Sequence, residues 1–147
     1  MLNLRMPAVG AHQEGINVIL QTTLSLAAAA AITNVWLGAR ISALRVGKKV
    51  LHGDGGDPQL QHRMRAQANF IEYTPFVLIL IAAIEMSGRG GRWLAIVGSI
   101  YMLARVAHAF GMDRTDSNPL RAGGILVTLA TLVGLAAVAV LIALGRM

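Results

Sequence analysis

The hydrophobic residues of this sequence are gathered in long runs, and polar residues interrupt the runs at only a few places. A helix that spans a membrane needs about 20 mostly apolar residues. Four segments meet this requirement, at about residues 16–44, 60–86, 92–112 and 119–144. We therefore predict an all-α fold, in which a single domain over residues 1–147 forms a four-helix bundle in a membrane.

Short connections rich in Gly, Asp and Pro separate the predicted helices. They cover residues 52–58, 87–91 and 113–119. Because all of them are short, neighbouring helices should run antiparallel. Asp57 before Pro58, and Asn118 before Pro119, have the pattern of a helix-capping residue followed by proline in the first turn. Both pairs predict a helix start.

The composition agrees with a membrane protein rather than a soluble one. Hydrophobic residues make up 55% of the chain and charged residues 14%, whereas soluble domains carry about 25% charged residues. The 13 Lys and Arg against 7 Asp and Glu are typical of cytoplasmic loops beside anionic lipid headgroups, so we expect membrane lipid, and no nucleic acid, as a partner. The absence of cysteine excludes disulfides, zinc-thiolate sites and a cysteine nucleophile.

The distribution of basic residues predicts the orientation in the membrane. The larger group surrounds the first and third connections and comprises Arg40, Arg45, Lys48, Lys49, Arg63, Arg114 and Arg121. The smaller group comprises Arg5, Arg89, Arg92 and Arg146. By the positive-inside rule, the first and third connections are cytoplasmic and both termini are on the non-cytoplasmic side. Alternatively, Arg40, Arg63 and Arg121 serve a site rather than topology. The first 15 residues lack the layout of a cleaved signal peptide, so we expect the first helix to direct insertion.

Small residues and one amide predict contacts between helices, because small side chains allow close approach in lipid. The small residues are Gly98, Ser99, Gly123, Gly124 and Gly134. Asn34 could reach a ligand, but an amide within a span more often forms a hydrogen bond across a helix interface.

Ionisable residues within spans are costly and usually mark a functional site. Arg65, Asn69 and Glu72 are spaced i, i+4 and i+7, and at about 100° per residue they fall within about 60° of one another on one helix face. Arg105 and His108 share a face of the third helix with Tyr101.

The connectivity brings Arg65, Arg105 and Arg121 to the same side of the membrane. These arginines exceed the single carboxylate of Glu72, so we predict that an anionic ligand completes the site. Alternatively, Glu72 pairs with Arg65 or Arg105 while the other arginines extend to the headgroups. No metal site is expected, because His108 has no second histidine on its face at a useful spacing.

The segment from Arg65 through Asn69 and Glu72 to Pro75 resembles the second-helix signature of the MAPEG proteins, the membrane-associated proteins of eicosanoid and glutathione metabolism. Arg105 and His108, with Arg121 sixteen residues after Arg105, resemble the pattern of its microsomal glutathione transferase and prostaglandin E synthase branch. The connection after the first helix looks like that of the short bacterial members, which implies a bacterial inner membrane.

The resemblance implies a homotrimer that binds glutathione between adjacent subunits near the cytoplasmic face. Five residues would hold glutathione as cosubstrate: Arg65, Asn69, Glu72, Arg105 and His108. Arg121 would be the catalytic residue that stabilises the thiolate. The implied function is that of a glutathione transferase or peroxidase in detoxification, acting on lipophilic small molecules, electrophiles or hydroperoxides.

Two departures from the pattern remove hydroxyl groups near the expected thiol. Met112 stands where several catalytic relatives have a tyrosine, and Ala122 stands where the prostaglandin synthase has a serine. The prostaglandin synthase reaction is therefore not expected. The alternative function is a non-catalytic, lipid-binding or scaffold protein with the same fold.

Overall fold

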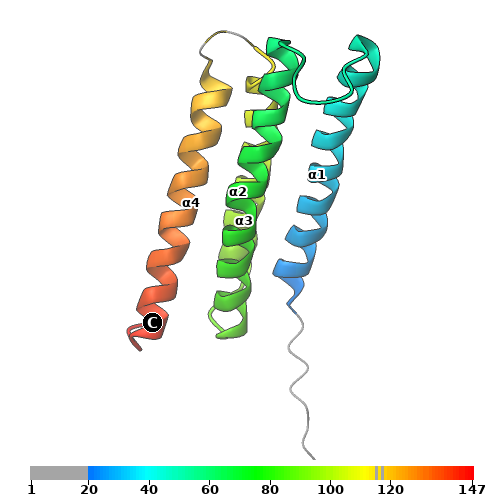
Figure 1. The fold of residues 1–147 in the computed structure, drawn as a ribbon. Helices are drawn as coiled ribbons and strands as arrows, with labels where there is room; N and C mark the ends of the chain where they lie inside the picture. The colour runs from blue at the N-terminus through cyan, green and yellow to red at the C-terminus, as the bar shows by residue number, and fades with distance from the viewer. Residues whose placement is uncertain (1–19, 115, 117) are drawn as a thin grey trace, which may run out of the picture.

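The computed structural model describes residues 20–114, 116 and 118–147. This part of the chain folds into four helices without any strand (Figure 1). The helices are α1 (Gln21–Lys48), α2 (Pro58–Met86), α3 (Arg92–Gly111) and α4 (Pro119–Ala143). The predicted all-α, four-helix fold is confirmed. The predicted start of the first helix at residue 16 lies outside the described residues.

Two helix boundaries differ from the prediction by more than one residue. The first helix continues to Lys48 rather than ending at residue 44, because the apolar pattern stops at Arg45 while the backbone remains helical. The helix is ended by the next residue, Lys49, which adopts a left-handed conformation with φ of 55°. The second helix begins at Pro58 rather than at residue 60.

The predicted capping residues explain where α2 and α4 begin. Asp57 accepts a 2.8 Å hydrogen bond from the backbone N–H of Leu60. Asn118 accepts one of 3.0 Å from the N–H of Arg121. In both cases proline occupies the first turn, where its missing N–H costs nothing.

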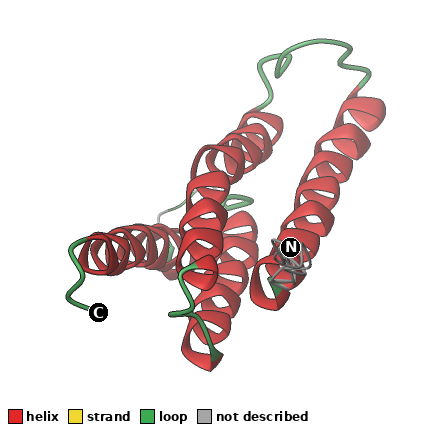
Figure 2. Cartoon of the chain, turned by 90° about the horizontal axis from the view of Figure 1, so that it is seen from below, coloured by secondary structure: helices red, strands yellow, loops and turns green. Residues whose placement is uncertain are grey.

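The helices α2 and α3 form the centre of the molecule, and α1 and α4 lie on opposite sides of this pair (Figure 2). Within the described residues α1 and α4 make no contact with each other. Successive helices run in opposite directions, so the α1–α2 and α3–α4 connections share one end of the bundle (Figure 1). Among the described helices, α4 therefore packs against α2 and α3 but not against α1.

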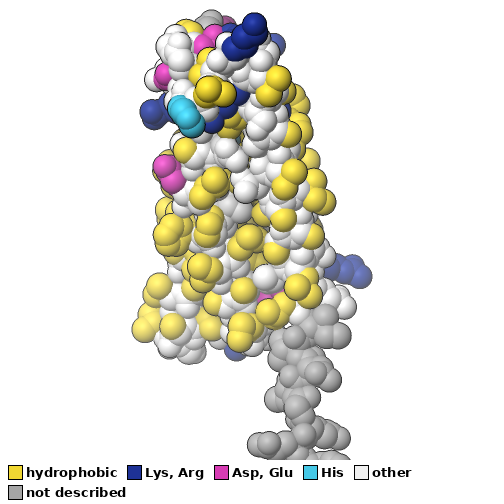
Figure 3. All heavy atoms as spheres, turned by 45° about the vertical axis from the view of Figure 1, so that its right-hand side comes forward, with side chains coloured by type: hydrophobic (Ala, Val, Ile, Leu, Met, Phe, Trp, Pro, Cys, Tyr) yellow, Lys and Arg dark blue, Asp and Glu magenta, His cyan; other side chains and the backbone are white. Residues whose placement is uncertain are grey.

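All four helices are long and apolar enough to cross a membrane. Hydrophobic side chains cover much of the face seen in Figure 3, and basic side chains gather at the end formed by the α1–α2 and α3–α4 connections. The outward apolar side chains include Ile32, Phe76 and Leu126, each more than 60% exposed. Such a surface suits lipid rather than water.

Hydrogen bonds join the helices at several heights. Gln67 of α2 donates to the Asn34 amide oxygen of α1 over 3.2 Å, which confirms the interhelical interpretation of Asn34. At the opposite end of the bundle, the Glu85 carboxylate accepts hydrogen bonds from the backbone N–H groups of Thr22 and Thr23 at 2.9 and 2.8 Å. Glu85 thereby satisfies donors in the first turn of α1, which has no capping side chain of its own.

Only part of the small-residue prediction is confirmed. Gly98 lies against the Leu26 side chain, and Gly124 lies against His108 of α3. Gly123 and Gly134 have nothing within 4 Å of where a Cβ would be, so neither makes a helix contact within the described part of the single chain.

Candidate functional site

Arg105 is a buried cation that lacks a carboxylate partner among the described residues. Its side chain on α3 is 2% exposed. Nη1 donates to the Thr128 hydroxyl oxygen over 3.2 Å, and the guanidinium carbon lies 5.9 Å from the centre of the Phe70 ring. Nε is buried without a hydrogen-bond partner, and no carboxylate of the described residues forms a salt bridge with Arg105. A buried charge in this condition is costly and favours an anionic ligand.

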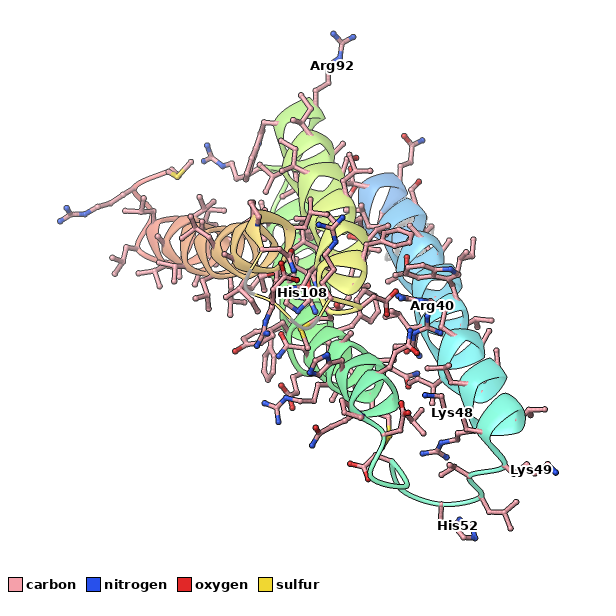
Figure 4. All side chains as sticks on the ribbon, turned by 90° about the horizontal axis from the view of Figure 1, so that it is seen from above. Arg40, Lys48, Lys49, His52, Arg92 and His108 are labelled. Atoms are coloured by element: carbon pink, nitrogen blue, oxygen red, sulfur yellow. The ribbon has the colours of Figure 1, made fainter. Side chains whose placement is uncertain are left out.

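His108 lies one turn from Arg105 and links α3 to the start of α4. Its side chain is 3% exposed, and Nδ1 is 3.0 Å from the backbone carbonyl oxygen of Arg121. Because a carbonyl oxygen can only accept, this bond places a proton on Nδ1 and leaves Nε2 for other partners. Figure 4 shows His108 at the meeting point of α2, α3 and α4.

Asn118 holds the first turn of α4 against the end of α3. Besides accepting from the Arg121 N–H, its amide nitrogen donates to the Gly111 carbonyl oxygen over 2.8 Å. A Cβ on Gly111 would come within 2.5 Å of the Arg121 backbone nitrogen, so only glycine allows this approach. The Arg121 backbone is therefore firmly placed, while its side chain is exposed.

The Arg121 side chain borders an open groove on the outer face of α4. The groove has a volume of about 600 Å³, and Ala122, Ile125, Leu126 and Leu129 supply its apolar wall. A guanidinium therefore lies beside a surface that suits an apolar molecule from the bilayer.

The three predicted residues of α2 lie at the edge of the buried face. Asn69 is half-buried, and its amide oxygen is buried without a partner. Arg65 and Glu72 are exposed. Glu72 also lines an apolar groove of about 390 Å³ with Tyr73, Phe76 and Leu132.

The structure does not contain the internal ion pair that the alternative interpretation requires. Within the described residues, Glu72 has no salt bridge to Arg65 or Arg105. That alternative is therefore wrong for this single chain. Of the six predicted site residues, the structure buries Arg105 and His108 together and leaves Arg65, Glu72 and Arg121 open toward the outside.

Sequence reasoning missed a charge cluster beside this site. Asp113, directly after α3, forms salt bridges with Arg40 of α1 and Arg63 of α2. The Arg40 guanidinium also lies 4.6 Å from the Trp36 ring and 5.4 Å from the Phe110 ring, and Figure 4 shows Arg40 among the side chains on the inner side of α1. The signal in the sequence was the excess of arginine near the connections, where Arg40 and Arg63 could serve either topology or a site, but Asp113 was not predicted as their partner.

Similarity to known proteins identifies the family of this chain. The model of the MAPEG family matches residues 23–141. Two curated relatives from Escherichia coli, the protein named inner membrane protein YecN in strain K12 and in strain O6:H1, are each 34% identical to this chain over 68 residues. The match covers 46% of this chain and 52% of each relative, so the chain spans about half the length of the curated relatives it matches. The family match covers most of the chain and nearly the full length of the four helices, and the protein therefore belongs to the MAPEG family.

Proposed function

We propose that this protein is a glutathione transferase or glutathione-dependent peroxidase of the bacterial inner membrane, acting on lipophilic electrophiles or hydroperoxides. The observation that carries the proposal is the buried Arg105 guanidinium without a counter-charge. Membership of the MAPEG family and the name of the YecN relatives support the ligand class and the membrane.

The predicted site residues fit the charges of glutathione, which carries two carboxylates and one ammonium group. Arg65 and Arg105 supply guanidinium donors for the carboxylates, and Glu72 supplies a carboxylate for the ammonium group. The Asn69 amide oxygen is a buried acceptor that still lacks a donor. His108 adds a ring nitrogen at the same end of α3.

Arg121 is the residue we assign to catalysis. Bound glutathione would supply a thiol, whose ordinary pKa is near 8.5. A guanidinium in a site of low dielectric constant favours the thiolate over the thiol. Arg121 would therefore increase the fraction of bound glutathione that is present as the nucleophilic thiolate. The apolar wall beside Arg121 would hold the lipophilic partner next to the sulfur.

We further propose that the active form is a homotrimer. In the single chain, Glu72 is exposed beside the apolar side chains of Tyr73 and Phe76, at a level where lipid would otherwise contact it. An exposed carboxylate among apolar side chains is costly in a bilayer. A neighbouring subunit that covers α2 would remove this cost and close the site around Arg65 and Glu72.

One observation favours a non-catalytic binding or scaffold protein as the second candidate. Met112 is buried next to the site and offers no hydroxyl group, and Ala122 offers none beside Arg121. A site built this way can bind an anion but has fewer groups to assist proton transfer.

Thermal unfolding of the detergent-solubilised protein with and without glutathione tests the binding site. A ligand present at about 100 times its Kd stabilises the folded state by about 2.7 kcal/mol. We expect this shift in the wild type, its loss in Arg65→Ala, and its retention in Arg92→Ala, which removes an exposed arginine at the other end of the bundle. No shift at millimolar glutathione would contradict the proposal.

Turnover with a generic electrophile then separates the two candidate functions. A transferase should lose most turnover in Arg121→Ala while largely retaining glutathione binding. A binding or scaffold protein should show no rate above the uncatalysed thiol reaction, even with glutathione saturating.

A further inference from the structure

Thr128 is a fully buried residue of α4 whose hydroxyl group forms two hydrogen bonds, one to Gly124 and one to Arg105. Its hydroxyl oxygen is 2.8 Å from the Gly124 carbonyl oxygen and 3.2 Å from Nη1 of Arg105. The carbonyl oxygen can only accept, so the hydroxyl hydrogen points to Gly124. The hydroxyl lone pairs are then available to Arg105, and Thr128 is held in the acceptor role.

The close approach of α4 to α3 makes this contact possible. A Cβ on Gly124 would be 2.5 Å from the His108 Cβ and 2.9 Å from the Ala104 carbonyl oxygen. Any larger residue would push α4 away from α3 and take Thr128 out of reach of Arg105. Gly124 therefore permits the close approach of the two helices, and Thr128, one turn later, uses this approach to bond to Arg105.

The bond to Thr128 uses one side of the Arg105 guanidinium, and Nε on the other side has no hydrogen-bond partner among the described residues. Among the described residues, Nη1 is the nitrogen with a partner, whereas Nε is buried and unpartnered. In a planar guanidinium, Nε and Nη2 form an edge with two parallel donors, which matches the two oxygens of a carboxylate. Anchoring Nη1 restricts rotation of the plane and thereby fixes the direction of that edge.

We propose that Thr128 is a positioning residue, which orients the Arg105 guanidinium for a bidentate bond to a carboxylate of the bound thiol peptide. This inference rests on the proposed function and assigns one carboxylate of glutathione to Arg105. Thr128 acts only through Arg105 and contacts no reacting atom.

Three variants of the full chain in detergent test the assignment by isothermal titration with glutathione. Thr128→Val keeps the shape and removes the hydroxyl group. Thr128→Ser keeps the hydroxyl group. Thr131→Val is the matched control, because Thr131 is a buried threonine of α4 whose hydroxyl has no bond to Arg105.

We expect Thr128→Val to weaken glutathione binding by roughly tenfold, as the loss of an orienting bond to a charged group implies. Thr128→Ser and Thr131→Val should bind like the wild type. Esters of glutathione with one carboxylate blocked identify the carboxylate. The ester that blocks the Arg105 partner should bind weakly to the wild type and lose little more in Thr128→Val.

The outcomes separate this inference from the proposed function. If the wild type binds no glutathione, the proposed function fails and the assigned ligand fails with it. If the wild type binds and Thr128→Val binds equally well, the positioning role alone is overturned. Equal losses in Thr128→Val and Thr131→Val, or a loss in Thr128→Ser as large as in Thr128→Val, would also overturn it, since they would indicate a general loosening of α4. The unfolding temperature of each variant without ligand accompanies the titrations.

Discussion

Arg63 of α2 donates from Nε to a carboxylate oxygen of Asp113 over 2.9 Å, and this contact joins the start of α2 to the connection between α3 and α4. Asp113 also pairs with Arg40, whose side chain is 12% exposed. One carboxylate thus neutralises part of the charge of two half-buried arginines and ties three segments together. This cluster lies at the same end of the bundle as Arg121.

We therefore expect Asp113→Asn to destabilise the fold, because it leaves Arg40 and Arg63 without a counter-charge. The expected loss is about 1.5–3 kcal/mol, the range for hydrogen bonds to charged groups. Thermal or denaturant unfolding in detergent measures it. Asp116→Asn is the control, since Asp116 is exposed and lies in the same connection. Equal stability of Asp113→Asn and the control would show that the cluster contributes nothing.

Gly124→Ala should destabilise the packing of α3 against α4. The new Cβ would overlap the His108 side chain and the Ala104 backbone, and overpacking of this kind costs about 1–3 kcal/mol. Gly123→Ala is a matched control one residue away, because a Cβ there has open space. Gly123→Ala should be neutral or stabilise α4 by up to about 1 kcal/mol, as alanine favours helix. The prediction fails if the two variants unfold at the same temperature.

The stability that the connection after α1 gives to the fold should depend on pH through the carboxyl group of Asp57. A hydrogen bond from Lys48, and then one from the Leu60 N–H, lower the pKa of the Asp57 carboxyl group below its ordinary value. A lowered pKa in the folded state means that the stabilisation is present above the unfolded pKa, about 3.9, and is lost as the pH falls through the folded value.

The stability difference between the wild type and Asp57→Asn should accordingly be largest near neutral pH and shrink as the pH falls below about 4. Unfolding temperatures measured from pH 7 to pH 3 test this. Lys48→Gln should raise the pKa of Asp57, which NMR titration of the carboxyl carbon can follow. An unchanged pKa in Lys48→Gln would show that the ion pair does not form in solution.

Single cysteines can test the predicted orientation, because the natural chain contains none. His52 lies in the α1–α2 connection and Ser87 at the end of α2, and both are exposed. If the α1–α2 connection is cytoplasmic, a membrane-impermeant maleimide should label Ser87→Cys in intact spheroplasts, and should label His52→Cys only after lysis. The reverse pattern would invert the topology.

The sequence predicted the helices and several of their ends for local reasons. Long apolar runs require helices in lipid, because backbone groups must find partners within the segment. Asp57 and Asn118 mark helix starts through bonds that span only three residues. Local rules failed at the end of α1, where Lys49 ends the helix by its backbone conformation after the apolar pattern has already stopped.

The sequence by itself therefore determined that this protein is a four-helix membrane bundle, and its spacing placed Arg65, Asn69 and Glu72 on one face of a helix. Only the tertiary structure decided which charges are buried and what they contact. Burial of Arg105 depends on the distance at which α4 packs against α3, and the partner of Arg105 is Thr128, 23 positions away. Asp113 likewise meets Arg40 and Arg63 across 73 and 50 positions. The helical period predicts which residues share a face of one helix. The packing of one helix against another determines which residues that face contacts.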